Sequence, residues 1–200
     1  MIRWSVEREA GAILAAIALI EGSWLVVNVL ANPRGFLRYT GWVNADAGPL
    51  GWILALIVAA AFTAMACRLP SVRANLFTFS WLKVLGLAVA ISAGFCEEAI
   101  FRKLLMDYLA RDGVGLTLQV LASGLAFGLV HGIWGAFKGS VTAAIGATVA
   151  TGVLGLGLAV VFLASHRVLA PCIVSHLLIN ALAEPGLVLA AVRGEMGSAT

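Results

Sequence analysis

Long apolar segments dominate this chain, and short polar breaks separate them. The apolar segments cover about 10–31, 50–67, 81–107, 115–134, 141–164 and 168–192. Each is close to the roughly 20 residues that an α-helix needs to cross the hydrocarbon core of a bilayer. Membrane β-strands would instead show short segments of alternating hydrophobicity, which this chain lacks. The pattern therefore predicts an all-α fold, a polytopic transmembrane helix bundle of about six spans.

The composition agrees with lipid as the main solvent of the folded chain. Of the 200 residues, 62% are hydrophobic and 12% are charged, whereas soluble domains have about 45–50% apolar and about 25% charged residues. A core of this size cannot bury so many apolar side chains, so we expect one membrane domain over residues 1–200. The net charge of +3 comes from scattered residues, with no basic run of the kind that binds nucleic acid.

Two adjacent carboxylates, Glu97 and Glu98, lie within the third apolar segment. An ionised carboxylate in hydrocarbon is costly, so each must be partnered or hydrated. Glu98 and Arg102 are four residues apart and therefore share one face of a helix. An ion pair between them would leave Glu97 free for other chemistry. The alternative is that both acids lie at a hydrated helix end.

A histidine, His131, lies in the fourth apolar segment, one helical turn after Phe127. Gly124, Gly128 and Gly132 form a stripe of small residues at intervals of four, where another helix can approach closely. Because His131 adjoins this stripe, we expect it to face a neighbouring helix and not lipid. A hydrogen bond between helices would explain this histidine equally well.

A second histidine, His176, lies in the last apolar segment and shares one helix face with Asn180, four residues later. The imidazole and the carboxamide are two hydrogen-bond donors aimed at the same place, which is what an oxyanion requires when a carbonyl is attacked. A polar clamp between two helices is the structural alternative for this pair.

The three motifs occur in a fixed order on separate predicted helices, and together they resemble a known family. That family is the CAAX protease and bacteriocin-processing (CPBP) family, glutamate-dependent intramembrane proteases that include the type II CAAX prenyl endopeptidases. The resemblance covers about 84–182. Its matching residues are Glu97, Glu98, Arg102, Phe127, His131, His176 and Asn180.

The resemblance implies a catalytic role for four of these residues. Glu97 would be the general base that activates a water molecule, and His131 would help to hold or deprotonate that water. His176 and Asn180 would stabilise the oxyanion of the tetrahedral intermediate. The implied reaction is hydrolysis of a peptide bond within the membrane.

The resemblance also implies that Glu98 and Arg102 brace the site. Because the four candidate catalytic residues can already manage both the water and the oxyanion, we expect that no cofactor is needed. A zinc protease is an alternative, because Glu97, His131 and His176 form an accepted set of ligands for catalytic zinc. The sequence lacks the compact pair of histidines typical of many zinc proteases, and Asn180 suits an oxyanion better than a metal. We therefore expect no metal site.

A protein without catalytic activity is an alternative of another class. A proton-coupled carrier or an immunity-type protein could also place ionisable side chains within the membrane. Transporters are commonly built from paired inverted segments, and no such pairing is visible here.

The expected partners are the lipid bilayer and a substrate tethered to it, a lipidated or membrane-anchored peptide. The Ala-, Gly- and Arg-rich composition is typical of a bacterial source, in which prenylated CAAX proteins are unusual. We expect an integral multi-pass protein of the bacterial cytoplasmic membrane. The sequence assigns no role to the first two spans or to Glu21, and its basic residues divide too evenly to fix the orientation.

Overall fold

The computed structural model describes residues 5–133 and 140–197, and all regular structure in these two ranges is helical. The helices are α1 (Val6–Ala31), α2 (Pro33–Tyr39), α3 (Gly48–Ala66), α4 (Pro70–Asn75), α5 (Trp81–Glu98), the π-helix η1 (Ala99–Leu104), α6 (Leu105–Arg111), α7 (Leu116–His131), α9 (Val141–Ala164), α10 (Ala170–Arg193) and the short 3₁₀-helix η2 (Glu195–Gly197).

Five helical segments are long and apolar enough to cross a bilayer. They are α1, α3, the continuous stretch Trp81–Arg111, α9 and α10. The sixth expected span, 115–134, is represented by α7, whose 16 residues fall short of the roughly 20 that a span requires. The prediction of an all-α polytopic helix bundle is confirmed.

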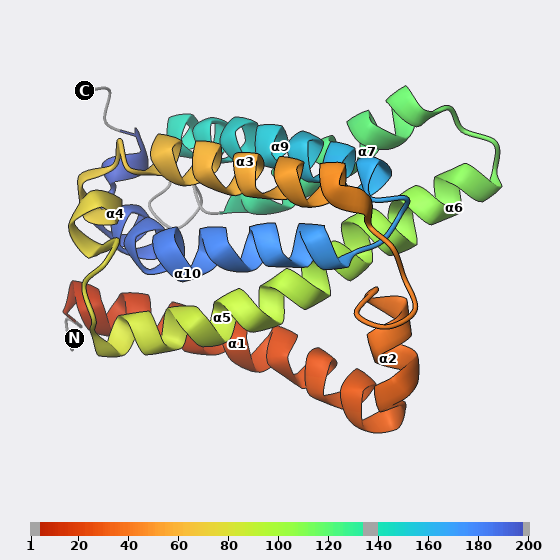
Figure 1. Cartoon of the computed structure of the whole chain (residues 1–200). Helices are drawn as coiled ribbons and strands as arrows, with labels where there is room; N and C mark the ends of the chain where they lie inside the picture. Colours follow the sequence, from red (N-terminus) through yellow and green to blue (C-terminus); the bar gives the residue numbers. More distant parts are fainter. Residues whose placement is uncertain (1–4, 134–139, 198–200) are drawn as a thin grey trace.

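Helix α10 lies at the centre of the bundle. In its most apolar 18-residue window 61% of the residues are buried, against 6% in the corresponding window of α1. Figure 1 shows α10 between α5 on one side and α3 with α9 on the other. A polar side chain on α10 therefore faces protein from several directions, whereas most of α1 is left for lipid.

Helices α7 and α9 pack closely because glycines line their contact. A Cβ atom at Gly128 would lie 2.5 Å from the carbonyl oxygen of Thr148 and 2.9 Å from the Cα of Gly152. One helical turn earlier on α7, Gly124 makes a similar contact, because a Cβ atom at Gly155 would lie 3.0 Å from the Cα of Gly124. The predicted small-residue stripe on this helix thus lets two backbones approach within van der Waals contact.

A polar cluster joins η1, α6 and α7 to the loop before α10. Asp107 accepts a hydrogen bond of 2.7 Å from Arg167 and lies 3.1 Å from the ammonium of Lys103. Arg167 also donates to the side-chain oxygen of Gln119 on α7. The cluster therefore connects η1, α6 and α7 to the loop that precedes α10.

Replacing Gly128 with alanine should destabilise the fold, because the new methyl group would meet backbone atoms that cannot move aside. Overpacking of this kind costs about 1–3 kcal/mol. The measurement is thermal unfolding of the detergent-purified protein. Gly22→Ala is the matched control, since its nearest neighbour, the Cβ of Ser92, would be 4.0 Å away. Equal melting temperatures for the two variants would contradict the close packing of α7 on α9.

Candidate active site

The two adjacent glutamates occupy the last two positions of α5, where the helix widens into η1. A π-helix is rare and is frequently found at functional sites. Glu98 is fully buried, whereas the side chain of Glu97 keeps 18% of its exposure. The two carboxylates therefore occupy different environments, although they are neighbours in sequence.

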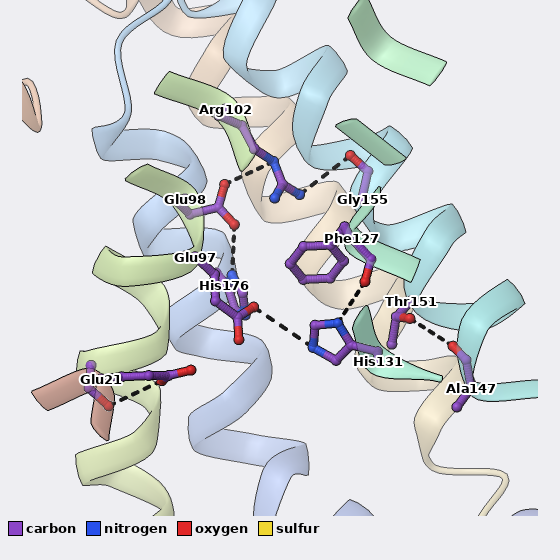
Figure 2. Close-up of polar contacts among 11 residues, drawn as sticks. Glu21, Glu97, Glu98, Arg102, Phe127, His131, Ala147, Thr151, Gly155 and His176 are labelled. Carbon is purple, nitrogen blue, oxygen red and sulfur yellow. Dashed lines mark hydrogen bonds and ion pairs between the residues drawn. The ribbon is translucent and has the colours of Figure 1, made fainter. Parts of the chain in front are cut away.

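Glu98 forms a buried ion pair with Arg102. The guanidinium Nε lies 3.1 Å from the Glu98 Oε2 atom, and both side chains are fully buried. Arg102 also donates to the carbonyl oxygen of Gly155 at 3.4 Å, and it stacks over the ring of Phe127 at 4.7 Å. The contact that the spacing of four residues predicts is therefore present, with additional partners from α7 and α9 (Figure 2).

His176 lies between the two glutamates. Its Nδ1 atom is 2.7 Å from Glu98 Oε1, and its Nε2 atom is 3.6 Å from Glu97 Oε2. The Glu98 carboxylate is paired with the Arg102 guanidinium and can only accept a hydrogen bond from His176, so Nδ1 of His176 carries the hydrogen. This contact turns the Nε2 atom toward Glu97.

His131 of α7 faces Glu97 of α5. Its Nδ1 atom is 2.8 Å from the carbonyl oxygen of Phe127, and its Nε2 atom is 3.8 Å from Glu97 Oε2. A carbonyl oxygen can only accept, so Nδ1 carries the hydrogen here too. Figure 2 shows the imidazole pointing across the gap between the helices toward Glu97.

The two imidazoles that face Glu97 Oε2 need a positive charge or a hydrogen-bond donor between them and the carboxylate. If both imidazoles were neutral, each would direct the lone pair of its Nε2 atom at the Glu97 carboxylate, and these groups would repel one another. The separations of 3.6 and 3.8 Å are also too long for direct hydrogen bonds. The arrangement is suited to an extra proton, to a water molecule that donates its hydrogens, or to a cation.

Asn180 lies one helical turn after His176 on α10 and is buried, with 8% exposure. Within the described part of the chain, no hydrogen bond joins its carboxamide to another residue. A buried polar side chain normally has one. The amide is therefore available to a ligand on the same side as His176.

These side chains line one cavity of about 660 Å³. Its walls are mostly apolar, with contributions from α1, α3, α5, α7, α9 and α10. Glu97, His131, His176 and Asn180 all line it. The four residues that the sequence singled out as catalytic candidates thus meet at one place, whereas Glu98 and Arg102 lie behind them.

Two further carboxylates, Glu21 and Glu184, also line the cavity. Both are close enough to Glu97 for their charges to interact. In Figure 2 the Glu21 side chain extends toward Glu97. Neither Glu21 nor Glu184 was predicted from the sequence to be part of the site. Glu184 follows Asn180 by four residues, so helical periodicity would have placed it on the same face.

The arrangement of possible metal ligands also bears on the chemistry of the site. In residues 5–133 and 140–197, no group of three or more His, Cys, Asp or Glu side chains is arranged to hold a metal ion. Glu97, His131 and His176 are the nearest to such a set, since both imidazoles turn Nε2 toward one carboxylate oxygen. Their present geometry favours small ligands such as water over direct coordination.

The fold and the cavity define the class of protein: it is an integral multi-pass membrane protein with carboxylates and imidazoles gathered inside its helix bundle. Comparison with known families gives the specific assignment. Residues 78–182 match the family described as type II CAAX prenyl endopeptidase Rce1-like, and the chain belongs to this family. This membership indicates a membrane protease. Neither a curated protein nor a solved structure matches the chain.

Replacing Arg102 with alanine should destabilise the protein strongly, because Glu98 would stay buried without its partner. Loss of one member of a buried ion pair costs about 3–5 kcal/mol. Thermal unfolding in detergent is the measurement, with Arg34→Ala as the control, since Arg34 is exposed on α2. An Arg102→Ala protein as stable as the control would show that the ion pair does not support the fold.

Proposed function

We propose that this protein is an intramembrane endopeptidase that hydrolyses a peptide bond in a membrane-tethered peptide or protein tail. The observation that carries the proposal is the convergence of Glu97 with two imidazoles in one cavity of the bundle. A carboxylate and imidazoles held in this way can bind a water molecule and move its protons. The family match supports the same class of reaction.

In the proposed mechanism, a water molecule bound between Glu97 and His131 is the nucleophile. Glu97 removes a proton from this water while the oxygen attacks the carbonyl carbon of the substrate. His131 holds the water, because its Nε2 atom faces the same carboxylate oxygen. The proton is then passed to the amide nitrogen, and the C–N bond breaks to give a carboxylate and an amine.

His176 and Asn180 stabilise the oxyanion in this proposal. The Asn180 amide can donate directly, since it lines the cavity and has no hydrogen bond to another described residue. For His176 the Nδ1 hydrogen is committed to Glu98, so donation from Nε2 requires a doubly protonated ring. Removing one asparagine donor from the oxyanion hole of a serine protease costs about 2.7–4 kcal/mol.

Glu98 and Arg102 act behind the reacting groups in this proposal. Glu98 fixes the ring orientation of His176, and Arg102 holds the Glu98 carboxylate in place through their ion pair. Such orientation by a buried carboxylate sets which nitrogen faces the substrate. We further propose the bacterial cytoplasmic membrane as the location and a lipidated or membrane-anchored peptide as the substrate.

Replacing Glu97 with glutamine should abolish cleavage and leave the fold intact, because the amide keeps the shape but cannot accept the proton. The assay uses reconstituted protein with a farnesylated fluorogenic peptide, its unlipidated counterpart and a single-span reporter. General-base catalysis typically contributes about 10²–10⁴-fold, so a loss of at least this size is expected. Glu7→Gln, an exposed change on α1, is the control.

Full cleavage by the Glu97→Gln protein would contradict the proposed general base. If the parent protein cleaves none of the three substrates but carries protons across vesicles, a carrier is the better assignment. Preference for the farnesylated peptide over its unlipidated counterpart would identify the prenyl group as part of what is recognised.

A zinc-dependent form of the same protease is a second candidate, favoured by one observation. Both Nδ1 atoms are held by acceptors, and both Nε2 atoms face Glu97. In metal sites, the ring nitrogen of a histidine ligand that does not bind the metal likewise donates its hydrogen to an acceptor, and this contact orients the ring. Glu97, His131 and His176 would be the ligands, and zinc would supply a water of lowered pKa.

Exhaustive chelation separates the two forms of the mechanism. We expect the purified protein to keep its cleavage activity after chelation, because Glu97 and His131 manage the water without an ion. Elemental analysis of the same sample should give zinc well below one per chain. Activity that is lost on chelation and restored by zinc would establish the zinc-dependent form instead.

A further inference from the structure

Helix α10 contains a proline, Pro185, and continues through it to Arg193. Proline has no backbone N–H, so it cannot donate to the carbonyl four residues earlier, and its ring crowds that carbonyl. The carbonyl affected here belongs to Ala181. In a membrane interior, a backbone carbonyl without a donor is costly, so another group must satisfy it.

The ammonium of Lys83 takes the place of the missing donor. Its Nζ atom lies 3.0 Å from the carbonyl oxygen of Ala181 and 3.0 Å from that of Leu182. The third contact, also 3.0 Å, is to the carbonyl oxygen of Leu76 at the end of α4. An ammonium has three hydrogens, and Lys83 uses all of them on backbone oxygens.

A close contact between helices places Lys83 where these carbonyls are. A Cβ atom at Gly86, one turn after Lys83, would lie 2.4 Å from the Cγ of Pro185. Helix α5 therefore packs directly on the proline ring of α10. Lys83 and Gly86 together fix α5 against this interrupted turn of α10.

The interrupted turn lies next to the candidate active site. Ala181 directly follows Asn180, and Glu184 directly precedes Pro185; both Asn180 and Glu184 line the cavity. A shift of this turn would move the two side chains relative to Glu97 on α5. The angle of the turn therefore sets part of the site.

We propose that Lys83 is a positioning residue, which replaces the donor that Pro185 lacks and so holds Asn180 in place for catalysis. Lys83 touches neither the cavity nor the proposed reacting groups. Its effect passes through the backbone of α10. The role in catalysis rests on the proposed function, whereas the pairing of Lys83 with Pro185 does not.

The test combines Lys83→Met with Pro185→Ala. Lys83→Met alone should lower the melting temperature by about 4 °C or more and lower kcat at temperatures far below unfolding, with KM little changed. In the Lys83→Met, Pro185→Ala double variant, the alanine N–H again reaches the Ala181 carbonyl. Both the melting temperature and kcat should therefore rise from those of Lys83→Met toward those of Pro185→Ala alone, short only of the contribution of the contact with the Leu76 carbonyl.

Pro171 provides the matched control, because it lies in the first turn of α10, where its missing N–H would have no partner in the helix. Pro171→Ala should not rescue Lys83→Met. If Pro185→Ala also fails to rescue stability, the pairing is wrong. Rescue of stability without rescue of kcat would overturn the positioning role.

The test also gives an answer if the single variant does not fold or if the parent protein is inactive. If Lys83→Met does not fold, recovery of folded protein in the double variant still supports the pairing, and failure to recover it contradicts the pairing. A parent protein without peptidase activity would refute the proposed function and with it the role in catalysis. The melting temperatures would still decide whether Lys83 serves the proline.

Discussion

The full burial of the Glu98 carboxylate among apolar helices constrains everything around it. A charge in such surroundings must have partners, and Arg102 and His176 supply them from within hydrogen-bonding or ion-pair distance. Arg102 in turn reaches the carbonyl of Gly155 on α9 and the ring of Phe127 on α7. One buried carboxylate thus links α5, α7, α9 and α10, and it determines which way the His176 imidazole faces.

Much of this arrangement could be predicted from the sequence. Helical periodicity determines which residues share a face, and a polar face is costly to expose to the hydrocarbon core of a bilayer. The spacing of four between Glu98 and Arg102, and again between His176 and Asn180, assigns each pair to one helix face. Apolar surroundings then require each polar face to point inward. The glycine stripe beside His131 likewise predicted that this side chain faces a neighbouring helix, and it faces Glu97 of α5.

Other features could not be predicted, because they depend on contacts between distant segments. No local pattern shows that Glu21 of α1 reaches the cavity, since this depends on how α1 packs against α5. The π-helix after Glu98 and the short length of α7 also have no clear signature in a single sequence. The role of Lys83 becomes visible only when Pro185 is seen beside it.

The π-helix Ala99–Leu104 has a geometric consequence for the long helix that contains it. A π-turn accommodates about one more residue than an α-turn, and one residue corresponds to a rotation of about 100°. The segment before it carries Glu97 and Glu98, and the segment after it carries Asp107, which binds Arg167. A single extra residue therefore sets the angular phase between the cavity and the distant polar cluster. Removing one residue would let the helix close into regular α-geometry, but it would turn one of the two sets of side chains away from its partners.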